Sequence, residues 1–175
     1  MKNEEVIKAF LNRKEAKKFS YEPHDFKTAI ISITDTYKAD VIFEKNEANG
    51  IRAVLRLKFD DVERDYKNEH CITKEDAENI VKFVNKNKNK VDKFIVHCEA
   101  GVSRSAGVGA AIMKALNGDD WDVFKNPLKC PNMKCYRTVL NAFVDAGYFD
   151  EDPMEEIKFK EETNIAKWKE FNEID

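Results

Sequence analysis

The chain has 175 residues with a hydrophobic content of 42% and a formal net charge of −3, values typical of a folded globular protein rather than a disordered one. Residues 1–8 carry charges throughout and lack the apolar core of a secretory signal, and no stretch approaches the roughly 18 apolar residues of a membrane span. We therefore expect a cytoplasmic protein that makes no membrane contact.

Charge is distributed unevenly along the chain. Residues 150–175 hold ten acidic and four basic side chains, which leaves residues 1–149 at +3. A mildly basic body suits an anionic substrate, although ordinary solvated surface is the commoner explanation, and nucleic-acid binding is not indicated. We expect one domain over residues 1–149 and an acidic helical extension over 150–175 that packs on it or binds a partner.

The four cysteines do not form a disulfide framework or a zinc motif. None of them shows the two-residue spacing of a zinc knuckle or a redox pair; they are Cys71, Cys98, Cys130 and Cys135. A reducing compartment fits this usage, and we expect neither a metal nor a cofactor.

The first half of the chain predicts three strands and a short helix. Residues 6–11 are read as a strand, and Asn12 with Glu15 forms a capping-box pattern that opens a helix to Phe19. Strands are then predicted at Thr28–Thr34, which is rich in β-branched residues, and at 52–59, where apolar and charged residues alternate.

The second half alternates helices with one further strand. Helices are predicted at 74–87, 105–116, 133–146 and 153–171, and a strand at 93–97. In the last helix Ile157, Ile165 and Trp168 are the candidates for docking on the body. This order predicts an α/β fold with a central, mostly parallel twisted sheet flanked by helices.

The segment 97–105, His-Cys-Glu-Ala-Gly-Val-Ser-Arg-Ser, carries the chemistry. Cys98 lies between a predicted strand and a predicted helix, and a cysteine at a helix N-terminus beside a cation becomes a reactive thiolate. Arg104 adds a planar charge that matches two phosphate oxygens. Backbone N–H groups between them would bind an anion. The predicted substrate-binding residues are Glu99, Ala100, Gly101, Val102, Ser103 and Arg104.

Three further residues of this segment have expected roles. Gly101 permits positive φ and a close approach of the backbone to the substrate, so that a larger residue should obstruct the loop. Ser105 can donate a hydrogen bond to the Cys98 sulfur, stabilising first the thiolate and then the sulfur as leaving group. His97 is expected to hold the loop rather than to transfer protons.

The pattern His-Cys, two residues, Gly, two residues, Arg-Ser resembles the signature of the cysteine-dependent protein tyrosine phosphatases, and its fuller form resembles the dual-specificity branch. The resemblance covers about residues 28–149 and implies their fold, with a phosphate-binding loop between a strand and a helix. It also implies a two-step reaction in which Cys98 takes the phosphoryl group, an Asp protonates the leaving oxygen, and water hydrolyses the phosphocysteine.

The resemblance places the general acid on a separate loop that follows another strand. Asp60 and Asp61 come directly after the predicted strand 52–59, and we favour Asp61; Glu63 and Asp65 are weaker candidates. The Trp-Pro-Asp form of this loop is absent, so the assignment depends on position, and adjacent Asp residues also commonly form turns. Pro131-Asn132 resembles a segment that supports the active-site loops, and a helix cap at Asn132 explains it equally well.

Three functions follow from these residues. The first is a phosphatase acting on phosphotyrosine, and on phosphoserine or phosphothreonine, in proteins. The second keeps the chemistry and changes the substrate to a phosphoinositide, a nucleotide or an RNA 5′ phosphate. Inositol lipids are disfavoured because the loop between Cys98 and Arg104 has one acid and no Lys, and no basic cluster of the lipid-binding kind is evident in sequence. The third is a phosphate-recognition module without turnover.

Overall fold

The four strands form one parallel sheet. A computed structural model describes residues 6–172 and contains β1 (Ile7–Leu11), β2 (Thr28–Thr34), β3 (Ile51–Lys58) and β4 (Lys93–His97). They pair in the order β1-β4-β2-β3, all in parallel. Every residue of the central strand β2 is buried, as a continuous run of β-branched and small residues predicts. The predicted central, mostly parallel sheet is confirmed.

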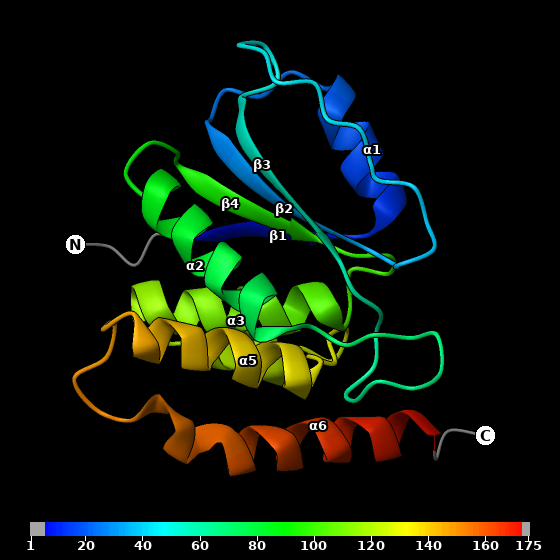
Figure 1. Cartoon of the computed structure of the whole chain (residues 1–175), viewed down its shortest axis with the longest axis vertical. Helices are drawn as coiled ribbons and strands as arrows, with labels where there is room; N and C mark the ends of the chain where they lie inside the picture. Colours follow the sequence, from blue (N-terminus) through cyan, green and yellow to red (C-terminus); the bar gives the residue numbers. More distant parts are fainter. Residues whose placement is uncertain (1–5, 173–175) are drawn as a thin grey trace.

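Helices cover both faces of this sheet (Figure 1). The helical elements are α1 (Arg13–Tyr21), α2 (Lys74–Asn87), α3 (Arg104–Asn117), α4 (Trp121–Lys125), α5 (Met133–Asp145), the 3-10 turn η1 (Pro153–Glu156) and α6 (Ile157–Asn172). Helix α1 lies on one face, α2, α3 and α5 lie on the other, and α6 lies beyond α5. None of the helices in the described part is long and apolar enough to cross a bilayer.

Alternating side chains of the strands supply two apolar cores. Ile30 and Ile95 point to the smaller core beneath α1, whereas Ile31 and Val96 point to the larger core against α2, α3 and α5. Burial of such side chains contributes about 1.5–3 kcal/mol each. The sheet is thereby fixed from both sides.

Side-chain caps set the starts of two helices as the sequence predicts. Asn12 Oδ1 accepts from the Glu15 N–H at 2.8 Å, and Glu15 accepts from the Asn12 N–H at 2.9 Å. Thr73 and Asp76 make the same reciprocal pair at α2. Helix α4 was not predicted, because five residues are too few to display a helical period.

The prediction that Ile165 and Trp168 dock the last helix is wrong. They are 54% and 62% exposed, whereas Ile157, Lys160 and Asn164 are buried and form the face of α6 that meets the body. The Lys160 ammonium is fully buried, 2.8 Å from Asp120 Oδ1 and 3.0 Å from Glu156 Oε2.

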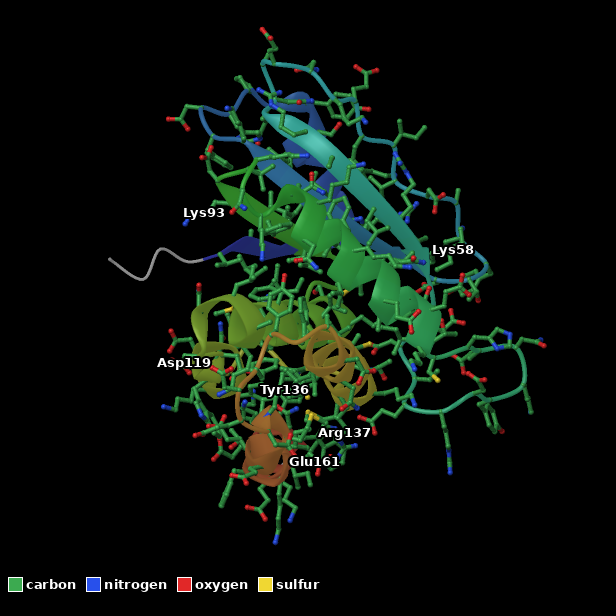
Figure 2. The ribbon with its side chains drawn as sticks, turned by 60° about the vertical axis from the view of Figure 1, so that its left-hand side comes forward. Lys58, Lys93, Asp119, Tyr136, Arg137 and Glu161 are labelled. Atoms are coloured by element: carbon green, nitrogen blue, oxygen red, sulfur yellow. The ribbon has the colours of Figure 1, made fainter. Side chains whose placement is uncertain are left out.

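The Lys160 ammonium also donates to the Tyr136 hydroxyl at 2.8 Å and lies over three aromatic rings, those of Trp121, Phe124 and Tyr136. These contacts compensate for removing the charge from water. At the edge of the same interface, Arg137 of α5 and Glu161 of α6 form an ion pair (Figure 2).

Because all four strands are parallel, their carboxyl ends meet at one edge of the sheet. The residues that follow β1, β2 and β4 at this edge are Asn12, Asp35 and Cys98, and Phe59 with Asp60 follows β3. Ligands of open parallel sheets bind at this edge. The predicted reactive segment therefore has the location expected of a site.

Candidate active site

The segment from Cys98 to Ser103 forms a loop between β4 and α3, and Arg104 is the first residue of that helix. Cys98, Arg104 and Ser105 are buried. The predicted junction of strand, loop and helix is present. The loop thus brings a thiol, a guanidinium and the positive end of a helix dipole together.

The carbonyl oxygens of the loop are turned away from its centre. Five of them accept hydrogen bonds of 2.6–3.2 Å from groups around the loop: Cys98 from His97 Nδ1, Glu99 from Arg13 N, Gly101 from Lys129 Nζ, Val102 from Cys130 N and Ser103 from Asn132 N. In a planar trans peptide the carbonyl and the next N–H point in opposite directions, and the described residues contain no cis peptide bond.

The N–H groups that follow these carbonyls therefore point to the inner side of the loop. They belong to Glu99, Ala100, Val102, Ser103 and Arg104. Several converging N–H groups at the start of a helix form an anion-binding site, and phosphate is a typical occupant. We refer to residues 98–104 as the phosphate cradle.

Gly101 is required by the conformation and by the space behind it. Its φ is +70°, and its N–H donates to Cys98 Sγ at 3.3 Å. A Cβ at this position would lie 2.7 Å from the Leu11 carbonyl carbon and 2.8 Å from the Asn12 nitrogen. The positive φ is as predicted, but the close approach is to the connection between β1 and α1 rather than to a substrate.

Ser105 and His97 contact the nucleophile and its backbone. The Cys98 thiol donates to Ser105 Oγ at 3.2 Å, and the hydroxyl can donate in the reverse direction to a thiolate. His97 Nδ1 lies against the Cys98 carbonyl and must carry a proton to donate to it. In the neutral ring Nε2 then has no proton, and it accepts a hydrogen bond from Ser32 Oγ at 2.6 Å. Burial lowers the pKa of His97 to about 4, which keeps the ring neutral.

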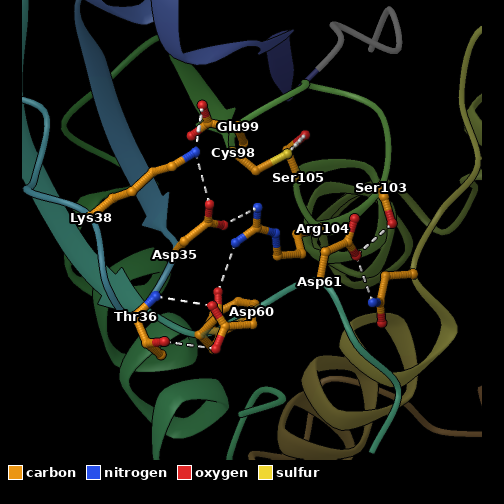
Figure 3. Close-up of polar contacts among 12 residues, drawn as sticks. Asp35, Thr36, Lys38, Asp60, Asp61, Cys98, Glu99, Ser103, Arg104 and Ser105 are labelled. Carbon is orange, nitrogen blue, oxygen red and sulfur yellow. Dashed lines mark hydrogen bonds and ion pairs between the residues drawn. The ribbon is translucent and has the colours of Figure 1, made fainter. Parts of the chain in front are cut away.

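The Arg104 guanidinium is fixed by the ends of two strands (Figure 3). Its Nη2 is 2.7 Å from Asp35 Oδ1 after β2, and its Nη1 donates to the Phe59 carbonyl after β3 at 2.7 Å. Within the described chain, the buried Nε has no hydrogen-bond partner, so this donor is available to a phosphate oxygen. The side chain is thus oriented through Nη1 and Nη2, while Nε has no partner in the described chain.

Asp35 and Lys38 extend this arrangement and were missed by sequence reasoning. Lys38 Nζ is 3.0 Å from Asp35 Oδ2 and 2.9 Å from Glu99 Oε1. Burial acts to raise the pKa of Asp35, but the contacts with Lys38 and Arg104 outweigh it and lower that pKa. The available signal was an acidic residue directly after a buried strand, at the edge where parallel strands end.

Asp60 and Asp61 have different surroundings. Asp60 is buried and accepts from the Thr36 N–H at 3.0 Å, the Thr36 hydroxyl at 2.8 Å and the His70 N–H at 2.9 Å. Burial acts to raise its pKa, and these hydrogen bonds outweigh burial and lower the pKa. Asp60 therefore remains an ionised acceptor that joins two loops.

Asp61 is exposed, and its Oδ1 accepts from Ser103 Oγ at 2.8 Å and from Asn132 Nδ2 at 2.9 Å. Its Oδ2 accepts no hydrogen bond from another described residue, so this oxygen has no partner within the described chain. Asn132 also caps α5, because its Oδ1 accepts from the Cys135 N–H at 2.9 Å. The same residue therefore caps a helix and contacts the loop that carries Asp61. Within the described chain, neither Glu63 nor Asp65 forms a hydrogen bond or an ion pair with the cradle, and Asp65 instead accepts from the Cys71 N–H.

A second cation lies behind the cradle. Lys129 Nζ donates to the Gly101 carbonyl at 2.6 Å, and burial lowers the pKa of this lysine while the charge of Cys98 opposes that effect. The segment 129–131 is in turn held by α6, because Lys167 Nζ donates to the Lys129 carbonyl at 2.6 Å and Asn164 Nδ2 donates to the Pro131 carbonyl at 3.0 Å.

Basic side chains of α1 adjoin the cradle on another side. A cavity of about 440 Å³ is lined by Asn12, Arg13, Lys14, Lys17, Glu99 and Ala100. The sequence shows no Lys or Arg between Cys98 and Arg104, and no basic cluster was expected elsewhere, whereas these cations come from a helix more than eighty residues before the cradle.

No protein-family model matches the chain, and no curated protein sequence matches it. A crystal structure of PTPMT1 in complex with PI(5)P matches with a TM-score of 0.50 and 14% sequence identity, over 79% of this chain and 89% of that chain. At this identity the likeness concerns the fold. The α/β fold with its four-stranded parallel sheet matches that of a protein tyrosine phosphatase-like enzyme, as expected.

Proposed function

We propose that the protein is a phosphatase that hydrolyses phosphate monoesters through a phosphocysteine intermediate. The observation that carries this proposal is the outward orientation of five cradle carbonyls around Cys98, which leaves their partner N–H groups for an anion. The unused Nε of Arg104 supplies a charged donor beside them. A nucleophile at the centre of a preorganised anion site is the arrangement that phosphoryl transfer requires.

The first step forms the intermediate. Cys98 Sγ attacks phosphorus in line while the bond to the leaving oxygen breaks, and Asp61 gives its proton to that oxygen. The inward N–H groups and Arg104 stabilise the charge on the three remaining oxygens. Ser103 and Asn132 hold Asp61 at the cradle through its Oδ1.

The second step regenerates the enzyme. A water molecule attacks phosphorus, Asp61 takes a proton from it, and the bond to Cys98 breaks to release inorganic phosphate and the thiolate. Ser105 lies 3.2 Å from the sulfur, and its hydroxyl can donate to the departing thiolate. The carboxyl group of Asp61 therefore acts in both steps, and the hydroxyl group of Ser105 stabilises the Cys98 thiolate before the first step and at the end of the second.

We favour phosphotyrosine in proteins as the substrate, with phosphoserine and phosphothreonine accepted as well. Asp61 is exposed, and Val102 at the rim of the cradle is 36% exposed, so a phosphorylated side chain on another protein can reach the site. An open rim is compatible with side chains of different lengths.

A phosphoinositide is the second candidate, and the cavity beside α1 favours it. Arg13, Lys14 and Lys17 line that cavity next to Glu99 and Ala100 of the cradle, where a second phosphate group would find cations. The matched PTPMT1 structure holds PI(5)P. A double variant, Lys14→Glu with Lys17→Glu, should reduce hydrolysis of PI(5)P far more than that of a phosphotyrosine peptide if this candidate is correct.

The chemistry is tested with para-nitrophenyl phosphate. We expect steady turnover by the wild type, none by Cys98→Ser, and a loss of at least about 100-fold for Arg104→Lys, which cannot reproduce the planar contact. Equal and negligible rates for the wild type and Cys98→Ser would overturn the proposal. Phosphate binding without turnover would then identify a recognition module.

The substrate class is tested by assaying phosphopeptides, PI(5)P, inositol phosphates and nucleotides side by side with one enzyme preparation. The ranking of kcat/KM distinguishes a protein phosphatase from an enzyme acting on phosphoinositides or nucleotides. Inorganic phosphate release gives the same readout for every member of the panel.

A further inference from the structure

A second cavity lies between α6 and the segment that supports the cradle. Its volume is about 440 Å³, and its walls include Pro131, Met133, Ile165 and Trp168. We propose that this cavity, which we call the α6 cavity, is a substrate subsite that binds an apolar side chain flanking the phosphorylated residue of a protein substrate. The inference rests on the proposed phosphatase function and names the part of the substrate that this enzyme recognises beyond the phosphate.

The α6 cavity adjoins the position of the leaving group. Asp61 must contact the leaving oxygen, and Asn132 holds Asp61 at 2.9 Å. Pro131 and Met133, the chain neighbours of Asn132, line the cavity, and so does Glu63, two residues after Asp61. A chain attached to the leaving oxygen therefore emerges beside this cavity.

A backbone hydrogen bond connects the rim of the cradle with a wall of the α6 cavity. Val102 is exposed at the cradle rim, and its carbonyl accepts from the Cys130 N–H at 3.1 Å. Cys130 itself lines the cavity, and Ile165 and Trp168 present more than half of their surfaces to solvent. Exposed apolar side chains that gather at a concave site next to reactive groups indicate a binding role.

The charges of the α6 cavity disfavour an additional phosphate. The described residues that line it include no Lys or Arg, and they include Glu63 and Glu161. Glu161 is paired with Arg137 at the α5–α6 interface (Figure 2). Glu63 makes no ion pair with a described residue. A phosphorylated inositol ring would meet a carboxylate here, but a Leu or Phe side chain would meet hydrocarbon.

The walls of the α6 cavity are held in a fixed relation to the cradle. Asn164 Nδ2 donates to the Pro131 carbonyl at 3.0 Å and lies 3.4 Å from Met133 Sδ. One turn earlier, the buried Lys160 ties α6 to Asp120 at 2.8 Å. The subsite is therefore built before substrate binds, which lowers the entropy cost of binding.

The test uses phosphotyrosine peptides in which Leu replaces Ser at one flanking position at a time. In the wild type, Leu at the position that reaches the cavity should raise kcat/KM about tenfold, as expected for burial of an aliphatic side chain. Trp168→Ala and Ile165→Ser should abolish that preference while para-nitrophenyl phosphate, which is too small to reach the cavity, is hydrolysed at the wild-type rate.

Matched controls come from the same helix. Phe171 and Phe159 are 82% and 62% exposed and do not line the cavity, so Phe171→Ala and Phe159→Ala should retain the peptide preference. Equal kcat/KM for all peptides in the wild type would overturn the proposal. A loss for Trp168→Ala that is as large with para-nitrophenyl phosphate as with the Leu peptide would also overturn it, because it would indicate a role in the fold.

Peptide binding to Cys98→Ser gives a readout that does not depend on turnover. The dissociation constant of the preferred Leu peptide, measured by fluorescence polarisation of a labelled peptide, should rise about tenfold when Trp168→Ala is added. This result with no turnover by the wild type would support the subsite and overturn the proposed chemistry. Turnover by the wild type with an unchanged dissociation constant would support the proposed chemistry and overturn the subsite.

Discussion

Asp61 Oδ1 lies 2.8 Å from Ser103 Oγ, so the loop that follows β3 is tied to the residue directly before Arg104. Its neighbour Asp60 is turned the other way and is occupied by Thr36 and His70. Two adjacent carboxylates thus have separate tasks. Asp60 joins the loops at the edge of the sheet, and Asp61 contacts the cradle.

Asp61→Asn should slow hydrolysis of phenyl phosphate by about 100-fold, because this poor leaving group needs the proton. The loss should be much smaller for an aryl phosphate with a strongly electron-withdrawing substituent. The measurement is kcat across a series of leaving groups. Asp60→Asn is the control, and it should lower stability without steepening the leaving-group dependence; the reverse pattern would make Asp60 the acid.

Lys129→Met should lower kcat/KM for para-nitrophenyl phosphate by about tenfold, because the variant loses a charge-assisted hydrogen bond to the Gly101 carbonyl. The inhibition constant of inorganic phosphate should rise in parallel, because the Gly101 carbonyl and the Val102 N–H of the cradle belong to one peptide group. Lys169→Met, an exposed position on α6, is the control. An unchanged inhibition constant would contradict a role in the cradle.

Stability should fall by about 2 kcal/mol between pH 7.5 and pH 5 because of His97. Its pKa is about 4 in the folded protein, below the ordinary 6.5, so the unfolded chain binds more protons over this window. Protonation therefore favours unfolding as the pH falls. Asp35 and Asp60, whose pKa values are lowered, lose their contributions only below the ordinary value near 3.8.

Urea denaturation at several pH values measures this dependence, and His97→Asn should flatten it. Nitrogen NMR of the His97 ring gives a direct titration of the wild type, with an expected midpoint near pH 4. A midpoint near 6.5 would show that the ring is not desolvated as the structure indicates.

Lys160→Met should cost about 3 kcal/mol, because it leaves the Asp120 carboxylate buried without its cation. Burial already raises the pKa of Asp120 in the wild type. Adding Asp120→Asn removes the buried charge and should restore part of the loss. Thermal denaturation measures both variants, with Lys158→Met at an exposed position as the control. Equal melting temperatures for Lys160→Met and Lys158→Met would show that the buried Lys160–Asp120 ion pair does not stabilise the protein.

The strands, the main helices and the reactive segment could be predicted because each depends on neighbouring residues. Periodicity located β2 and α2, the capping pairs located two helix starts, and the spacing from Cys98 to Arg104 fitted one loop. Asp35 and Lys129 could not be found in this way. They reach the cradle from other parts of the chain, and only the order of strands and the path after α4 bring them there.

The error at α6 has a different cause. Apolar residues are normally those that dock a helix, so the sequence favours Ile165 and Trp168 over a lysine. Here Lys160 contacts Asp120, Glu156 and Tyr136 inside the interface, and these contacts compensate for the loss of hydration of its charge. No local pattern in sequence signals such a match.

The outward carbonyls of the cradle have a consequence for protein engineering. Only one of the five donors, His97, belongs to the nine residues 97–105, and the other four come from the start of α1 and the segment before α5. If those nine residues were transplanted into a different strand–helix junction, the peptide planes would be free to rotate and present oxygen to an incoming anion. A successful graft would need Lys129 to Asn132 and the β1–α1 corner as well, in the same relative positions.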